Sequence, residues 1–181
     1  MAEKKTETKT AKKSEKKEEK MMNLSDLFED VLKDIYDAEQ QIIKAMPKMI
    51  EKAQSKELKQ GFKEHLEVTQ KQVQRIEQIF QELEMPAKGK HCKGMEGLIK
   101  EGEEVMGEPM EPQVMDAALI AAAQKIEHYE ISSYGTARAY AQALGHQNVA
   151  RMLDMTANEE GQTDKKLTAL AEGHINAKAK M

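Results

Sequence analysis

Apolar residues recur every three to four positions along four long stretches of the chain, which is the spacing of the buried face of an α-helix. The first stretch covers residues 24–54, and its apolar positions are Leu27, Val31, Ile35, Ile42, Met46 and Met49. Asn23 and Asp26 resemble a helix-capping pair at its start. Pro47 should kink this helix without ending it, because the apolar pattern resumes beyond the proline.

The second stretch covers residues 55–84, with Ser55 as a predicted N-cap, and Pro86 and Gly89 follow its end. Its inward positions are Leu58, Phe62, Leu66, Thr69, Val73, Ile76 and Phe80. The third helix is expected from Pro112 to Leu144, because Gly145 occupies the position that commonly follows a helix. The fourth is expected over residues 148–172 and should end at Gly173.

Residues 85–112 form a long connection that is rich in glycine and proline and contains one short amphipathic segment near residues 95–106. Two helical hairpins with tight turns are therefore joined by one long crossover. This connectivity is typical of ferritin-like bundles. We predict an all-α fold, a ferritin-like four-helix bundle of two helical hairpins with a long crossover containing a short helix.

Composition supports an all-α fold and separates a tail from the bundle. Aromatic residues make up 4% of the 181 residues, charged residues make up 33%, and strong helix formers are abundant. Residues 1–22 are a Lys/Glu-rich segment with no large apolar side chain before Met21, so we expect a disordered charged tail, with a continuous Lys/Glu helix as the alternative. The predicted bundle covers residues 23–175, and residues 176–181 are expected to form a short C-terminal tail.

The net charge and the cysteine content limit which binding partners and which cellular compartment we expect. The net charge is −4, and the eight lysines and five glutamates of residues 1–22 give +3, which leaves −7 for the remainder. An acidic body makes nucleic acid an unexpected partner, and only the tail would suit one. The single cysteine excludes an intrachain disulfide, and no apolar run is long enough to span a membrane. We therefore expect a cytoplasmic protein.

Acidic residues near the middle of the helices are the candidates for chemistry. Glu39 has apolar or aromatic neighbours three and four positions away on both sides, so it is expected to face the core. Glu130 is its counterpart in the third helix, and Glu127 lies one turn away. Buried carboxylates from several helices can together hold divalent cations, whose charge offsets the cost of burial. The alternative is a core glutamate that is hydrogen-bonded to a tyrosine or a histidine.

The second and fourth helices supply Glu67 and Glu160, each near mid-helix. Glu67 has polar neighbours that are typical of a solvated face, and His65 faces inward better. The first-choice metal ligands are Glu39, Glu67, Glu130 and Glu160. The second choices are Glu127, Glu159, Asp164, His65 and Gln70.

Several segments resemble the YciE/YciF stress-protein family over residues 23–175. They are 116–131 (DAALIAAAQKIEHYEI), 133–136 (SYGT), 95–99 (MEGLI), 65–67 (HLE) and 163–168 (TDKKLT). The resemblance implies a ferritin-like fold, a homodimer, a role in bacterial stress responses and a metal site. Gln70 and Gln162 stand where the Glu-x-x-His pattern of di-iron bundles places histidine.

Two hypotheses for function follow. The first is a di-iron-type oxidoreductase that binds Fe or Mn and oxidises bound Fe(II), with a tyrosine such as Tyr36, Tyr129 or Tyr134 nearby. The second is a non-enzymatic helical bundle whose inward acids form a hydrogen-bond network without metal, which the missing histidines favour. Cys92 has no second cysteine near it and is expected to be structural.

Overall fold

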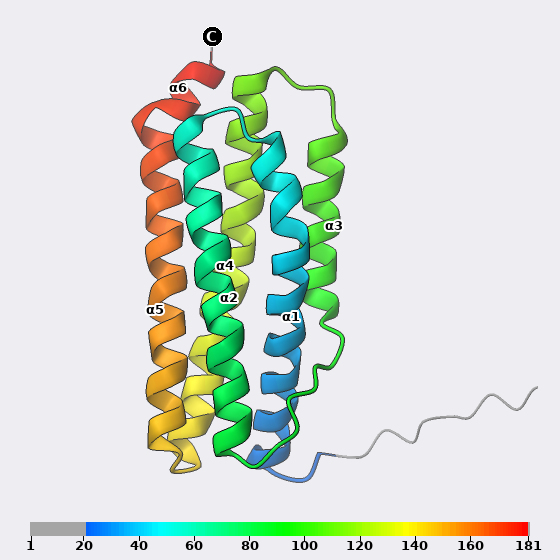
Figure 1. The fold of residues 1–181 in the computed structure, drawn as a ribbon, viewed down its shortest axis with the longest axis vertical. Coiled ribbons are helices and arrows are strands. Elements are labelled where there is room, and N and C mark those ends of the chain that lie inside the picture. Colours follow the sequence, from blue (N-terminus) through cyan, green and yellow to red (C-terminus); the bar gives the residue numbers. More distant parts are fainter. Residues whose placement is uncertain (1–20, 181) are drawn as a thin grey trace, which may run out of the picture.

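The computed structural model describes residues 21–180, and these residues form a helical bundle (Figure 1). Its long helices are α1 (Leu24–Lys52), α2 (Lys56–Glu82), α4 (Pro112–Ala143) and α5 (Gln147–Leu170). The shorter α3 (Lys93–Gly107) lies within the crossover and packs on the outside of the bundle, against α1 and α4. The predicted fold class is confirmed. Residues 1–20, which make up most of the expected charged tail, lie outside the described residues.

The predicted helix caps are confirmed. The Asn23 side chain accepts a hydrogen bond from the backbone N–H of Asp26 at 3.0 Å, which satisfies one of the free donors at the start of α1. Ser55 does the same for α2 through the backbone N–H of Leu58. Pro47 lies inside α1, which continues past it. Gly145 follows α4 with φ at +84°, in the left-handed region that favours glycine.

The predicted end of the fourth helix at Gly173 is wrong. The chain passes from α5 into a π-helical segment, η1 (Ala171–Ile175), and then into the short α6 (Asn176–Ala179). Ile175 is buried and belongs to the apolar core, so its packing holds the helical path beyond the glycine. Part of the expected C-terminal tail is therefore helical.

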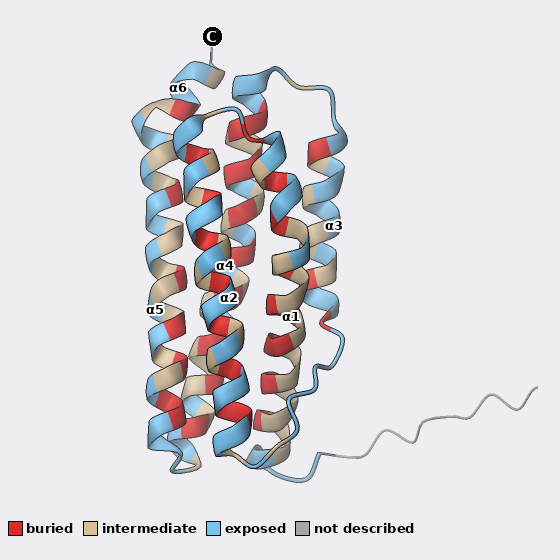
Figure 2. Cartoon of the chain, viewed as in Figure 1, coloured by how far each residue is buried: buried red, intermediate tan, exposed pale blue. Residues whose placement is uncertain are grey.

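Two apolar clusters fill the bundle, and buried positions follow the inward faces of the helices (Figure 2). A polar layer separates the clusters. In α1, Ile35 belongs to one cluster and Ile42 to the other, and the buried Glu39 lies between them. Glu130 in α4 and Glu160 in α5 are likewise buried between residues of the two clusters. The fold therefore brings carboxyl groups from different helices to one height.

Asp116 of α4 fixes the turn between α1 and α2. Its two carboxylate oxygens accept hydrogen bonds from the backbone N–H groups of Gln54 at 2.7 Å and Ser55 at 2.8 Å. Because these donors belong to a tight turn, one buried side chain ties the first hairpin to the second.

Within residues 21–180, no helix combines the length and the apolar character that crossing a lipid bilayer requires.

Candidate metal centre

Four side chains of the polar layer converge from three helices. His65 comes from α2, Glu127 and Glu130 come from α4, and Glu160 comes from α5, and one donor atom from each lies within 4.8 Å of the others. Their exposed fractions are 5%, 1%, 2% and 0%, respectively. Imidazole nitrogen and carboxylate oxygen are metal ligands, so this group is able to hold a metal ion.

Glu39 of α1 lies beside this group. Its Oε1 atom accepts a hydrogen bond from the Tyr134 hydroxyl, and both side chains are buried. Burial, and then the negative charge of Glu160, raise the pKa of Glu39 to about 8. Glu39 thus completes a layer to which all four long helices contribute, with Tyr134 orienting its carboxyl group.

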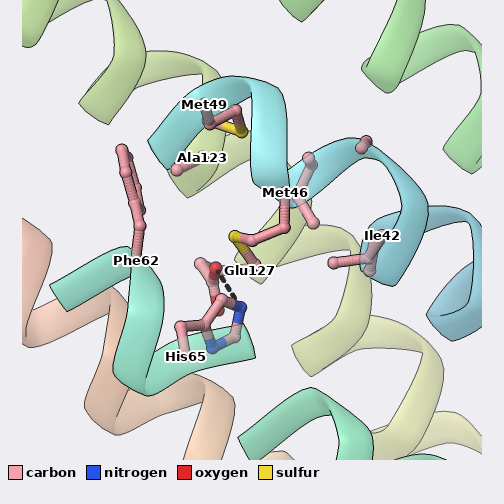
Figure 3. Close-up of a pocket in the computed structure, with 9 residues that line it drawn as sticks. Ile42, Met46, Met49, Phe62, His65, Ala123 and Glu127 are labelled. Atoms are coloured by element: carbon pink, nitrogen blue, oxygen red, sulfur yellow. Dashed lines mark ion pairs between the residues drawn. The ribbon is translucent and has the colours of Figure 1, made fainter. Parts of the chain in front are cut away.

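His65 presents a neutral imidazole. Burial lowers its pKa from the ordinary value, so the ring is uncharged at neutral pH. Its Nε2 atom lies 3.1 Å from Oε1 of Glu127 (Figure 3). A neutral ring offers a nitrogen lone pair, which a protonated ring lacks, so the buried state of His65 suits metal ligation.

The carboxyl groups of the layer resist ionisation when no cation is present. Burial raises the pKa of Glu127 to about 8. Burial and then the charge of Glu39 raise the pKa of Glu130, and burial and then the charge of Glu127 raise that of Glu160. A bound cation would reverse this effect, because positive charge favours the carboxylate form.

Many polar atoms of the layer have no hydrogen-bond partner. Seven such buried atoms belong to it: Oε2 of Glu39, Nε2 of His65, Oε1 of Gln72, Oε2 of Glu127, Oε1 and Oε2 of Glu130, and Oε2 of Glu160. No lysine or arginine is buried anywhere in residues 21–180. Unpaired buried polar atoms are rare and costly in native proteins, so this concentration fits a cation as the absent partner.

An outer set of side chains orients Glu160. The Gln72 side-chain amide donates to Glu160 and also to Oε2 of Glu159 at 3.2 Å. Glu159 is in turn held by both terminal nitrogens of Arg75, at 2.7 and 2.9 Å. Gln72 was not among the predicted ligands, although it lies seven residues, or two helical turns, after His65.

The structure does not bring every predicted ligand into the layer. Glu67 and Gln70 are exposed, because Glu67 is two positions from His65 and therefore about 200° away around the helix. Glu159 belongs to the Arg75 pair. Asp164 is partly buried outside the layer, where it accepts a hydrogen bond from Gln124 at 2.9 Å. Of the first choices, the layer contains Glu39, Glu130 and Glu160, and α2 contributes His65 in place of Glu67.

Cys92, the cysteine of the crossover, makes hydrogen bonds that hold the crossover in place. Cys92 is buried at the N-terminus of α3, where its sulfur accepts a hydrogen bond from the backbone N–H of Met95. Its Sγ also lies 2.9 Å from the hydroxyl of Tyr129, which donates to Asp34. These bonds fasten the crossover to α1 and α4.

A small cavity of about 10 Å³ lies against one side of His65 and Glu127 (Figure 3). Its remaining walls are apolar and come from α1, α2 and α4: Ile42, Ala45, Met46, Met49, Phe62, Ala123 and Ile126. The layer is therefore bordered on this side by apolar side chains, which lower the local dielectric constant.

Two helical hairpins, a long crossover and a mid-height layer of buried histidine and carboxyl groups define a ferritin-like helical bundle. The chain belongs to the DUF892 family, which is described as a domain of unknown function and matches residues 23–180. This result confirms the family resemblance and extends it to α6.

The relatives agree with this assignment. The chain is 44% identical to Protein YciF of Escherichia coli (strain K12) over 160 residues, which are 88% of this chain and 96% of YciF. The crystal structure of the E. coli stress protein YciF matches with a TM-score of 0.83 over 86% of this chain and 99% of that chain. YcfI from Rhodopseudomonas palustris is 48% identical and matches with a TM-score of 0.80 over 81% and 94%. A Xanthomonas campestris protein with 20% identity shares the fold, with a TM-score of 0.66.

Proposed function

We propose that this chain is a stress-associated protein that binds divalent transition-metal ions in the polar layer of its bundle. His65, Glu127, Glu130 and Glu160 are the ligands, and Glu39 is the acid beside them. The observation that carries the proposal is the set of seven buried nitrogen and oxygen atoms that have no hydrogen-bond partner. A histidine among carboxylates favours Fe, Mn or Zn over Mg or Ca, which prefer oxygen ligands alone.

Charge balance supports two ions per chain. Glu39, Glu127, Glu130 and Glu160 carry four negative charges when all are ionised, and two divalent cations neutralise them. Because the raised pKa values of Glu39 and Glu127 are about 8, the layer must release protons when it binds metal at neutral pH. Metal affinity should therefore increase with pH.

The residues of the chain position and insulate such ions. Tyr134 holds one oxygen of Glu39, Gln72 holds Glu160, and an apolar cluster packs on each side of the layer. An iron or manganese ion bound there would supply redox chemistry, and the reaction that we propose is oxidation of Fe(II) to Fe(III), with dioxygen or peroxide as the electron acceptor.

A second candidate is a bundle whose acids stay protonated and hold no metal. Its support is the direction of the pKa shifts, since Glu39 and Glu127 with pKa values of about 8 are mostly neutral at pH 7. In this case chelators and added metals would leave the thermal stability unchanged, whereas a bound ion raises it by mass action.

The biological setting rests on the relatives. The E. coli relative is a stress protein, and we extend a role in the stress response to this chain because the two sequences are 44% identical along nearly their whole length. A homodimer and a cytoplasmic location are part of the same proposal. Size-exclusion chromatography with light scattering tests the dimer directly.

Titration with Co(II), whose visible absorption reports its ligands, tests the metal site. The wild-type chain should bind Co(II) saturably, and Glu160→Gln should weaken binding by about 100-fold. The matched control is Glu67→Gln, which changes an exposed glutamate and should bind like the wild type. Absence of saturable binding to the wild type, or equal loss in both variants, would overturn the proposal.

A further inference from the structure

A second cavity joins the polar layer to the surface between α2 and α5. It has a volume of about 50 Å³, and its lining contains the buried His65 and Glu127 together with the exposed Glu64 and Lys166. We call this cavity the passage, because its lining includes both buried candidate ligands and exposed residues.

The passage is suited to water and ions. Its polar groups include the hydroxyl of Thr163, which lies 3.5 Å from Nδ1 of His65. A volume of this size holds a few water molecules when polar partners are present. The cavity of about 10 Å³ described above is smaller, and seven of its nine lining residues are apolar, so it offers a hydrated cation little compensation for lost water.

A glycine keeps the passage open. Gly61 lies inside α2 and contributes to the wall, opposite Leu170 of α5. A Cβ atom at this position would meet only the Leu170 Cδ1 atom, at 3.9 Å, so no backbone constraint requires glycine there. Glycine in a helix interior is unfavourable relative to alanine, by about 0.5–1 kcal/mol. The space that it leaves belongs to the passage.

We propose that metal ions reach the layer through this passage between α2 and α5, with Gly61 setting its width and Lys166 setting the charge at its mouth. The inference rests on the proposed metal site, since a passage for ions requires a site at its end. It assigns to Gly61 and Lys166 a role in the rate of metal loading, not in affinity.

The first test compares the rate of Co(II) loading in two glycine variants by stopped-flow absorption. Gly61→Leu places a side chain in the passage and should slow loading by about tenfold or more. Gly102→Leu is the matched control, because a Cβ atom at Gly102 of α3 also meets a single side-chain atom at 3.9 Å, away from the passage. Equilibrium affinity should match the wild type in both variants.

The second test changes charge at the surface, where misfolding is not a concern. Lys166→Glu should speed Co(II) loading by about threefold to tenfold at low ionic strength, with the gain falling as salt is added. Lys165→Glu makes the same change at the neighbouring exposed lysine, which does not line the passage, and should have a smaller effect.

The outcomes separate the two proposals. If the wild type binds Co(II) but Gly61→Leu loads as fast as Gly102→Leu, the passage is wrong and the metal site stands. Equal rate changes from Lys166→Glu and Lys165→Glu would likewise overturn the role of Lys166. Failure of the wild type to bind Co(II) at all removes both the site and the passage.

Discussion

At the scale of single residues, Glu160 has opposite effects on the stability of the metal-free and the metal-bound protein. Its carboxyl group is fully buried, lies near His65, Glu127 and Glu130, and has one oxygen without a hydrogen-bond partner. Without a cation, such a group must stay protonated or pay a large desolvation penalty. The same group is therefore unfavourable in the metal-free protein and favourable in the metal-bound protein.

We therefore expect Glu160→Gln to stabilise the metal-free protein and to weaken metal binding. Glu160→Gln should raise the free energy of unfolding of the metal-free protein at pH 8 by about 1–2 kcal/mol. The reason is that a buried carboxyl group must keep a proton to stay neutral at this pH, whereas an amide is neutral without one. The same variant should bind metal about 100-fold more weakly. Urea unfolding in the presence of a chelator measures the first effect, and Glu67→Gln, at an exposed position, should change neither quantity.

The stability of the metal-free protein should also depend on pH with a definite sign. Glu39 and Glu127 have pKa values of about 8 in the folded chain, against 4.5 for an ordinary glutamate, so the folded state binds more protons between these values. Their contribution to stability is complete below pH 4.5 and is lost as the pH rises through 8. His65, whose pKa is lowered from 6.5, acts in the opposite direction, and only below about pH 6.5.

The melting temperature in chelator should therefore fall between pH 6.5 and pH 8.5, a window in which His65 is already neutral. Glu127→Gln should make this decline shallower, because one of the responsible groups no longer titrates. A melting temperature that rises over this window, with no difference between wild type and variant, would contradict the raised pKa values.

At the scale of the helices, periodicity predicted much of the arrangement. The apolar neighbours of Glu39 placed it in the core, and the caps at Asn23 and Ser55 located the starts of α1 and α2. The prediction that Glu67 lies in the layer was wrong. It rested on glutamate as a metal-ligand type and gave too little weight to helical periodicity, although the neighbours of His65 already indicated that His65 faces inward.

Other features of the helices could not be predicted from local pattern. A buried glutamine such as Gln72 has the same sequence signal as a surface glutamine, and only the position of Glu160 on another helix makes it significant. The helical path beyond Gly173 depends on the burial of Ile175, a tertiary contact that local propensity does not contain.

The hydrogen bonds by which Asp116 ties the two hairpins together should contribute to stability. Asp116→Ala should lower the free energy of unfolding by about 2–3 kcal/mol, because the backbone N–H groups of Gln54 and Ser55 lose their acceptor. Metal affinity should change little, since Asp116 is outside the layer. The control is Glu111→Ala, at an exposed position just before α4 with no side-chain capping bond, which should leave the urea midpoint nearly unchanged.

At the scale of the whole molecule, the polar layer divides the apolar core into two clusters. The proposed ligands come from α2, α4 and α5, and Glu39 of α1 lies beside them, so an ion bound there would connect three of the four long helices directly. A ligand that binds only the folded state stabilises it, by about 2.7 kcal/mol at a free concentration of 100 times its dissociation constant.

Metal should therefore control the stability of the bundle. Saturating Mn(II) or Co(II) should raise the melting temperature of the wild type by several degrees, roughly the effect of 2–3 kcal/mol. Chelator should reverse the change, and Glu160→Gln should show none of it. An equal shift in the variant would assign the effect to metal bound elsewhere on the acidic surface.

The most direct test of the central claim is the metal content of the protein itself. Protein purified without chelator and dialysed anaerobically against Fe(II) or Mn(II), then against metal-free buffer, is analysed by inductively coupled plasma mass spectrometry. The proposed metal site predicts two retained ions per wild-type chain, following from the charge balance of four buried carboxylates, and none in Glu160→Gln. Wild-type protein that retains no metal, or as little as the variant, would contradict it.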